Sequence, residues 1–500
     1  GLKAVSVIND TIRLIEDNYD VKSIEQNILK SDLNDQKVYE EFQSGNCRDI
    51  FQFGSDSMIS LLKQIKPTNI NDLSVVNALF RPAVIQAQGI EAYLKNKRNP
   101  EEAKERLDNV HSKLWKITKE SFGVPIFQEQ IMFILQELGG FTLAEADKSR
   151  KILKLLHKGN QEKNKDFYNM MDKFKKQARK NGISKEHIAW LFDILGKYSE
   201  YSFCKAHSLS YAMNAYISMW LKIYYPKEYF SSLFNHSTSS DLSWFIKQVK
   251  RQGTKINEFK SGKTDDKFSV DYSNNCITFG LNKIKGMQRK DVSIVNKVEA
   301  DNVYDLVEYL IENKISKRTI EPLCRLRYFN EIFDNSKQLE IIFAKVKSKK
   351  KNESIKEKID FIINDNGAIE DWTKQEYIKF EKKYFDFYFD EHPFVIRYDK
   401  IREETPYLIN QISSPKQLQD KKKGGVILCG VINDIILKKA KKTGREYYKL
   451  IIEDDEKQLY VTVFNSRDIV PLEIGDFIVM KVSKSKFGFT KAKQSEIKIM

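Results

Sequence analysis

The segment YSEYSFCKAHSLSYA at 198–212 gathers residue types that could bind a phosphate. Lys205, His207 and Ser208 lie together, and an apolar helical pattern follows them. At the start of a helix, backbone amides, the helix dipole and a nearby cation all favour an anion. The alternative is that His207 is a structural hydrogen-bonding residue, and the spacing leaves both interpretations open.

A second group of cations follows Asp147. Arg150, Lys154 and Lys158 recur every four residues, so they share one helix face, and Lys151 lies beside them. A basic stripe of this kind can follow a phosphate backbone. The alternative is the solvent-facing edge of a helix, where most lysines lie.

Arg81 lies in an unusual setting, between Phe80 and Pro82. An arginine among large apolar residues, held by a proline, is either part of a buried ion pair or turned toward a ligand. Residue types alone do not choose between these two.

Helical periodicity predicts the elements that position these groups. Residues 1–30 are predicted helical, 56–66 a helix that stops before Pro67, and 121–235 a nearly continuous helical region broken at 139–140, 181–182 and Pro226. A possible strand is predicted at Asp49–Phe53. Farther on, the pattern predicts short strands at 255–280, short helices at 280–345, a solvated helix or linker at 345–372, and a helix at 373–386.

The last part of the chain differs in texture. Five apolar, alternating segments between 424 and 495 predict a small five-stranded barrel of the oligonucleotide-binding type.

Composition narrows the class of protein. The 500 residues are enough for three or four domains, and the net charge of +15 favours a polyanionic partner, nucleic acid above all. The alternative source of that charge is the lysine-rich composition of an AT-rich genome. The five cysteines form no CxxC pair, which argues against zinc and disulfides and fits a reducing cytosol. No apolar run of membrane-spanning length and no signal peptide is present, so no membrane partner is expected.

Eight segments resemble, in order, motifs of the alpha subunit of bacterial DNA polymerase III, the family C replicative polymerases. ALFRPAV (78–84) resembles that family's ALFRPGP, and YSFCKAHSLSYA (201–212) resembles its GFNKSHSAAYA. The other six are VYEEFQSGNCRDIFQFGSDSM (38–58), FGVPIFQEQIM (122–132), GGFTLAEADKSRKILKL (139–155), WLKIYYPKEYFSSLF (220–234), ITFGLNKIKGM (277–287) and KKYFDFYFDEHPF (382–394).

The resemblance implies a multidomain α+β protein, mostly helical, with an OB-type barrel at its C-terminal side as in the Gram-negative branch of the family. It implies the C-terminal part of a polymerase palm at 1–120, fingers at 121–235, a region that binds duplex DNA and the sliding clamp through helix-hairpin-helix units at 236–395, and the OB domain at 396–500.

The same resemblance assigns roles to the basic residues. Nucleotide or primer phosphates would contact Arg81, Arg150, Lys151, Lys154, Lys205, His207 and Ser208. The duplex backbone would contact Gly280, Lys283, Lys285 and Gly286. Single-stranded template would contact the barrel hairpin Lys438, Lys439, Lys441, Lys442 and Arg445, with Tyr447, Tyr448, Tyr460 and Phe464 nearby for stacking. The segment QLEIIF resembles a clamp-binding peptide through Gln338, Ile342 and Phe343, but it also fits an ordinary structural helix.

Catalysis in the family uses three aspartates that hold two magnesium ions. Gly1 and Leu2 look like the last letters of the DFLGL-type motif that carries the third aspartate, so all three are expected upstream and this chain alone is predicted inactive. Asp10, Asp17 and Asp20 do not match the motif positions and receive no metal role. The upstream half is either a separate polypeptide, as in a split gene, or has been trimmed from the sequence.

Some residues depart from the family pattern: Gly54 replaces a glutamate, Ala83 replaces a glycine, and HKG (157–159) ends the fingers motif. These departures favour a phage or mobile-element version, in a bacterial cytoplasm, nucleoid or infected cell. The expected function is part of a DNA-directed DNA polymerase acting on primer-template DNA and dNTPs with an upstream polymerase half, and with a sliding clamp and exonuclease subunit as further partners. The alternative is a non-catalytic DNA- and clamp-binding scaffold, and the joint retention of Arg81, Arg150, Lys205 and His207 favours the enzyme.

Overall fold

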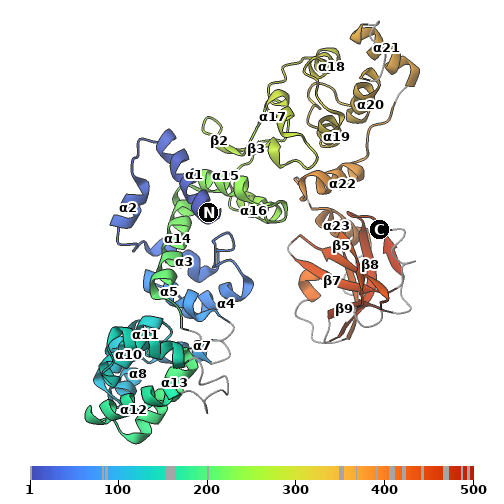
Figure 1. Cartoon of the computed structure of the whole chain (residues 1–500). Helices are drawn as coiled ribbons and strands as arrows, with labels where there is room; N and C mark the ends of the chain where they lie inside the picture. The colour runs from blue at the N-terminus through green and yellow to red at the C-terminus, as the bar shows by residue number, and fades with distance from the viewer. Residues whose placement is uncertain are drawn as a thin grey trace. The chain divides into compact units, whose positions relative to one another are not determined.

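The computed structural model divides into two compact units, Gly1–His236 and Ser237–Met500, and each is considered by itself (Figure 1). Among the residues described, no helix is long and apolar enough to cross a membrane. The structure describes residues 3–81, 84, 88–153, 165–199, 202–347, 354–366, 369–389, 392–404, 412–418, 424–440, 444–455, 457–464, 472–485, 488–492 and 496–499.

The first unit is built from helices that begin and end at the capping residues the sequence provides. Ser55 accepts a hydrogen bond from the Met58 amide at the start of α4, and Gly140, at a φ of 66°, ends α10. The helices are α1 (Lys3–Asn18), α2 (Ile24–Lys30), α3 (Gln36–Ser44), α4 (Asp56–Ile65), α5 (Ile70–Leu79), α7 (Gly89–Arg98), α8 (Pro100–Asp108), α9 (Ser112–Thr118), the 3₁₀ turn η1 (Lys119–Ser121), α10 (Gln128–Gly139), α11 (Leu143–Leu153), α12 (Lys165–Lys180), α13 (Lys185–Ser199), α14 (Lys205–Tyr224) and α15 (Pro226–His236).

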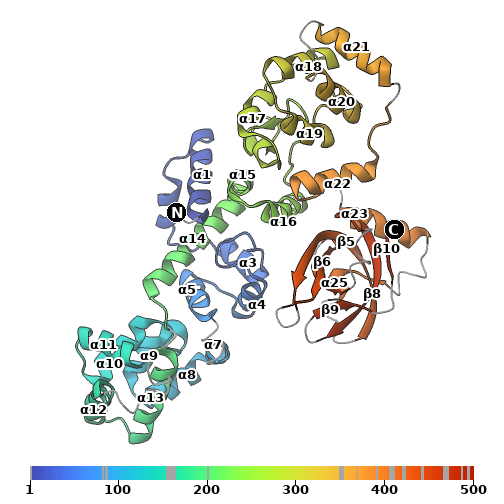
Figure 2. The same cartoon turned by 45° about the vertical axis from the view of Figure 1, so that its right-hand side comes forward.

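Helix α14 is the central element of this unit. It packs against α1, α3, α5 and α15, with Ala212, Tyr216 and Met219 buried along it (Figures 1 and 2). Its far end is held by the buried Lys222, whose ammonium lies 2.6 Å from the Asp49 carboxylate. A fixed α14 in turn fixes the segment at its N-terminal end, which contains the predicted phosphate-binding residues.

A second group of helices, α10 to α13, packs around α10 (Figure 1). Phe174 and Phe192 meet edge to face with ring centroids 5.1 Å apart. Gly139 lies so close to Phe174 that an added Cβ would fall 2.5 Å from its ring. The break predicted at 139–140 therefore marks a close approach of two helices.

The predicted strand at Asp49–Phe53 is wrong, because this segment forms turns. Ile50 and Phe53 are buried while Phe51 is exposed, and Gln52 adopts a φ of 70°. The apolar residues therefore anchor a turn rather than one face of a strand. The helix predicted at 56–66 is confirmed as α4.

The helical part of the second unit includes a small sheet with strand order β1-β3-β2. Strand β3 is buried along its whole length. The helix predicted at 373–386 is confirmed as α22. The elements are α16 (Ser239–Arg251), β1 (Thr264–Asp265), β2 (Ser269–Asp271), β3 (Cys276–Gly280), η4 (Leu281–Lys283), α17 (Arg289–Val295), α18 (Val303–Glu312), α19 (Lys317–Arg325), α20 (Ser336–Val346), α21 (Ile355–Asn366), α22 (Lys374–Phe385) and α23 (Pro393–Glu404).

The rest of the unit is a seven-stranded sheet, drawn in orange and red in Figure 2. The pairings run β5–β6–β7–β9–β8 and then return from β8 to β5, so they form a closed cycle over a core that includes Leu428, Leu450 and Met480. The mixed α+β class predicted from the sequence is thus confirmed. The elements are β4 (Ile412–Ser413), α25 (Pro415–Leu418), β5 (Gly424–Lys439), β6 (Glu446–Glu453), β7 (Gln458–Val463), β8 (Phe477–Ser485), β9 (Gly488–Lys491) and β10 (Ile497–Ile499).

Candidate nucleic-acid interface

The fold joins two motifs that lie some 75 residues apart in the sequence, FGVPIFQEQIM and YSFCKAHSLSYA. Phe127 and Phe203 form an isolated parallel bridge. The Gln128 amide donates to the Phe203 carbonyl at 2.9 Å, and the Gln128 side chain donates to the Ser202 carbonyl at 3.2 Å. These bonds hold the start of α14 against the start of α10.

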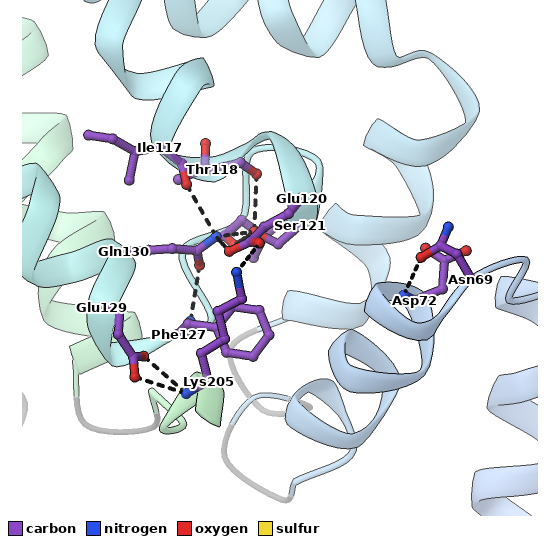
Figure 3. A network of polar contacts seen from close by, with 11 residues as sticks. Asn69, Asp72, Ile117, Thr118, Glu120, Ser121, Phe127, Glu129, Gln130 and Lys205 are labelled. Carbon is purple, nitrogen blue, oxygen red and sulfur yellow. Dashed lines mark hydrogen bonds and ion pairs between the residues drawn. The ribbon is translucent and has the colours of Figure 1, made fainter. Parts of the chain in front are cut away.

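The Glu129 carboxylate lies at the N-terminal end of α14 (Figure 3). Its two oxygens accept from the Lys205 backbone amide at 3.1 and 3.0 Å. A carboxylate is favoured there by the helix dipole and by the free amides of the first turn. The Glu129 carboxylate therefore occupies a backbone amide of the helix start that the sequence analysis predicted to bind phosphate.

The Lys205 ammonium is also paired, with the Glu120 carboxylate at 2.5 Å (Figure 3). Buried Gln130 also contacts this carboxylate, because its side-chain amide donates to Glu120 at 3.4 Å. The same amide donates to the Ser121 hydroxyl at 2.8 Å. The Lys205 and Glu120 side chains are 37% and 24% exposed, so solvent reaches the pair. An anion that binds Lys205 must compete with Glu120.

Arg81 and His207 both contact the ring of Phe203. The Arg81 guanidinium lies 4.9 Å from the ring centroid of Phe203, and the His207 ring lies 5.4 Å from it. Tyr211 meets His207 edge to face at 4.5 Å, and Phe51 lies 5.8 Å beyond Tyr211. The structure thus brings Arg81 and His207 to one ring at the start of α14, the helix that Lys205 begins, and it adds a row of partly exposed rings.

Ser208 lies in a different environment from its neighbours. It is fully buried, and its hydroxyl donates to the Ser74 carbonyl at 2.6 Å. Asn77 donates to the same hydroxyl at 3.5 Å. In this arrangement Ser208 joins α14 to α5, which begins where Asn69 accepts from the Asp72 amide (Figure 3).

The cations of α11 are not part of that group. Arg150 is nearly buried and lies 2.7 Å from the Asp147 carboxylate, and Lys151 pairs with the same residue at 2.7 Å. Hydrogen bonds from Lys151 and Arg150 lower the pKa of Asp147. Helix α11 packs against α10, α12 and α13, and Lys154 lies outside the described residues. The phosphate-binding role of these three residues stays a prediction.

The glycine loop predicted to bind duplex DNA follows β3. Gly280 is buried, and an added Cβ there would fall 2.4 Å from the Phe268 nitrogen, so this position needs glycine for packing. Lys283 donates to the Ser237 carbonyl at 3.1 Å, and Lys285 pairs with Asp386 at 3.0 Å. Gly286 is exposed at a φ of 87° with open space around it. Of the four residues, Gly286 is thus the one whose surroundings leave most room for DNA.

The C-terminal sheet carries a strip of rings and cations on its outer face. The register places Lys438 opposite Tyr447, and Lys449 opposite Thr462. The Lys449 ammonium lies 5.8 Å from the Tyr460 ring. Tyr460 and Phe464 are 56% and 70% exposed, so neither belongs to the core. We call the residues Lys438, Tyr447, Lys449, Tyr460 and Phe464 the outer strip.

Two of the predicted hairpin cations, Lys441 and Lys442, lie outside the described residues. Lys438 and Lys439 end strand β5, and Arg445 precedes β6. Lys439 pairs with Glu446 at 3.4 Å. Tyr448 is half-buried and packs against the core of the sheet.

The predicted clamp-binding residues lie on α20. Ile342 and Phe343 are buried in the packing of that helix, and Gln338 is half-buried. To contact a clamp, the two apolar side chains would have to leave this packing, and clamp binding stays a prediction.

Within the residues that the structure describes, no group of three or more His, Cys, Asp or Glu is placed to hold a metal ion. Asp10, near the start of the chain, lies 2.7 Å from His236 and 3.9 Å from Arg13. The two-magnesium site that the resemblance implies stays a prediction.

Sequence reasoning missed the carboxylates that hold Lys205. The QEQ of the first motif contains Glu129, but its partner Lys205 lies 76 residues farther along the chain. Phe51 and Lys449 were also missed, because a single exposed ring or lysine has no periodic signature.

Comparison with known proteins indicates the family of this chain. Residues 4–182 match the family model described as the bacterial DNA polymerase III alpha subunit finger domain, which starts well before residue 121, the predicted start of the fingers. The DNA polymerase III subunit alpha of Aquifex aeolicus is 30% identical over 450 residues, which cover 88% of this chain and 36% of that protein. The same subunit of Campylobacter jejuni is 28% identical over 93% of this chain and 39% of its own length.

The chain spans less than half the length of these relatives, and the domain limits stay predictions. The family resemblance is confirmed: the chain contains the finger domain of bacterial DNA polymerase III alpha subunits and is related over most of its length to a C-terminal portion of them.

Proposed function

We propose that this chain supplies the fingers, the duplex-binding region and a single-strand-binding barrel of a DNA-directed DNA polymerase, which adds deoxynucleotides to a primer 3′-hydroxyl. One observation carries the proposal above the others. Arg81, which is distant in the sequence, contacts Phe203 together with His207 at the start of α14, where Lys205 is the first helical residue.

The nucleotide triphosphate would take the Lys205 ammonium from Glu120. A triphosphate offers several charged oxygens where Glu120 offers one carboxylate, and the pair is open to solvent, so the exchange costs little. Arg81 and His207 would then contact the same phosphates from the Phe203 ring. Glu129 stays on the α14 amide and keeps the helix in place.

The outer strip would bind single-stranded template. Exposed rings stack on bases regardless of sequence, and lysines beside them can contact the phosphate backbone. The closed cycle β5–β6–β7–β9–β8 supports an OB-type barrel, whose second and third strands form the usual binding face. Here these strands are β6 and β7, which carry Tyr447, Lys449 and Tyr460.

Two magnesium ions would activate the 3′-hydroxyl and stabilise the departing pyrophosphate. We propose that an upstream half of the polymerase holds them, because the described residues provide no such site. The relatives are longer than this chain, which spans 36–39% of their length.

Primer extension with magnesium and four dNTPs tests the proposal, with this chain alone and mixed with an upstream half from a related alpha subunit. Extension in the mixture and none by the chain alone is the expected result. Extension by the chain alone would overturn the division of labour. Extension by neither, together with tight DNA binding, would overturn the catalytic role.

The second candidate function is a DNA-binding scaffold derived from a polymerase. The outer strip favours it as much as it favours the enzyme, because the strip needs no metal to bind DNA. A Lys205→Ala variant separates the two, since a scaffold would lose nothing measurable while a polymerase would lose nucleotide affinity.

A further inference from the structure

A pocket of about 320 Å³ lies between α9, η1 and α10, on a surface that none of the predicted sites includes. Most of its lining is charged. The lining residues are Lys113, Lys116, Ile117, Lys119, Glu120, Phe133 and Glu137.

The pocket lining contains three lysines and two glutamates, and both glutamates are already in ion pairs. Glu137 is paired with Lys113, whose hydrogen bond and charge lower the glutamate's pKa, and Glu120 is paired with Lys205. Within the part of the chain that the structure describes, Lys116 and Lys119 form no ion pair. Both ammonium groups are exposed, and the charge of Lys116 contributes to the lowered pKa of Glu137.

Phe133 is the one large apolar side chain that the pocket leaves in solvent. It is 50% exposed, although its neighbours on α10, Ile131, Ile134 and Leu135, are buried. Leaving half a phenyl ring in water forgoes burial that a core position would provide. An exposed ring beside cations is a typical stacking platform for a nucleobase.

The composition of the lining decides between nucleic acid and a docking peptide. An apolar peptide would need several apolar contacts, but only Ile117 and Phe133 provide them here. One flat ring with two exposed ammonium groups instead matches one base and its flanking phosphates.

We propose that this pocket binds single-stranded DNA, with a base stacked on Phe133 and phosphates on Lys116 and Lys119. The inference extends the proposed function to a second single-strand contact, in the first unit and apart from the outer strip. Glu120 belongs to both the pocket and the Lys205 pair, so a bound strand would lie beside the nucleotide site.

Fluorescence anisotropy of a labelled oligothymidylate on the full chain tests the pocket. The background is the double variant Tyr460→Ala/Phe464→Ala, which removes the exposed rings of the outer strip. In this background we expect Phe133→Ala to weaken binding roughly 5-fold to 100-fold, the loss of one stacked base. We expect Lys116→Gln/Lys119→Gln to reduce the slope of log K against log salt by about 1.4, since each single-strand phosphate contact contributes about 0.7.

Matched controls lie on α12. Tyr168 is 49% exposed, and Lys176 and Lys180 are exposed lysines one turn apart. Tyr168→Ala and Lys176→Gln/Lys180→Gln should change neither affinity nor salt slope. All these positions are on the surface, so thermal unfolding should be unaffected.

Cross-linking to an oligonucleotide that carries 5-iododeoxyuridine should label the peptide that contains Phe133. An unchanged affinity with Phe133→Ala, or a lysine effect without a phenylalanine effect, would overturn the stacking site. Tighter binding of a polyglutamate peptide than of the oligonucleotide would overturn it in favour of an acidic protein partner. Primer extension by the reconstituted mixture reports on the proposed function separately, so the two can fail independently.

Discussion

A lysine meets a glutamate at a critical position in each unit, and the two pairs differ in burial. In the first unit, Lys205 and Glu120 lie 2.5 Å apart and remain 37% and 24% exposed. In the second, Lys382 on α22 and Glu453 on β6 lie 3.3 Å apart and are only 7% and 9% exposed. His392 and Gln458 also contact Glu453, at 3.4 and 3.0 Å.

The difference in burial means that the pair in the first unit can open at low cost, whereas the pair in the second unit cannot. Opening the buried pair would leave a desolvated charge without a partner, at a cost of several kcal/mol. The half-exposed pair costs about 1 kcal/mol or less to open, because water replaces the lost contact. The half-exposed pair of Lys205 and Glu120 suits a site that exchanges anions. The buried pair of Lys382 and Glu453 holds α22 against the sheet.

Breaking the buried pair should have the largest effect. Glu453→Gln leaves Lys382 without its carboxylate, so we expect the free energy of unfolding to fall by about 3–5 kcal/mol. Urea unfolding of the full chain, followed by circular dichroism, measures it. Glu473→Gln is the control, because Glu473 also pairs with a lysine of α22, Lys379, but is 72% exposed. A loss for Glu453→Gln no larger than that of the control would refute the fastening role.

Acid should weaken the same pair without any mutation. Burial acts to raise the pKa of Glu453, but the His392 hydrogen bond and the Lys382 charge outweigh it and lower the pKa to about 2. Because the folded pKa lies below the ordinary 4.5, this stabilisation is complete above pH 4.5 and is lost as pH falls toward 2, roughly 3 kcal/mol in all. Urea midpoints between pH 6 and 3 should fall less steeply for Glu453→Gln than for the unmodified chain.

Removing the cation of the half-exposed pair should affect binding, not folding. In the mixture with an upstream half, Lys205→Ala should raise the KM for dNTP about 10-fold or more, the loss of one charge-assisted hydrogen bond to phosphate. Lys205→Arg should restore part of it. Lys197→Ala, which breaks an exposed pair with Asp193 on α13, should leave KM unchanged. A normal KM for Lys205→Ala would remove this residue from the nucleotide site.

Removing the anion should have the smallest effect, and of opposite sign. Glu120→Gln keeps an oxygen for Gln130 but releases Lys205, so we expect the KM for dNTP to fall by up to about 5-fold. Glu137→Gln is the matched control, since its partner Lys113 is not part of the nucleotide site. A raised KM for Glu120→Gln would mean that Glu120 orients Lys205 rather than competing for it.

The sequence predicted local features well and long-range partners poorly. Caps and breaks such as Ser55, Gly139 and Pro226 act on their own neighbours, so α4, α10 and α15 follow from the pattern. The motif resemblance assigned Arg81 and His207 to the same ligand, and both contact Phe203, but their phosphate-binding role stays a prediction. The pairing of Lys205 with Glu120 depends on packing between α14 and η1, 85 residues apart, and no spacing rule reaches that far.

The turn at Asp49–Phe53 shows the opposite limit. Its apolar residues suggested a strand, but the Cys47 thiol donates to the Phe53 carbonyl at 3.4 Å and Gln52 adopts a left-handed conformation. Such a turn is selected by the tertiary contacts of its buried side chains, which a local pattern does not contain.

The closed strand cycle also constrains the order in which the C-terminal region can form. Strand β5 pairs with β6 along one part and with β8 along another, and β9 completes the cycle by lying between β7 and β8. Until β8 and β9 have left the ribosome, β5 and β7 present unpaired edges that invite aggregation. Closing the cycle also requires β5 to pair with β8 between residues 46 to 60 positions apart, from Val431 with Phe477 to Gly424 with Lys484, and such long-range pairing slows folding. The stability of the β5–β9 cycle therefore depends on β8 and β9 being intact.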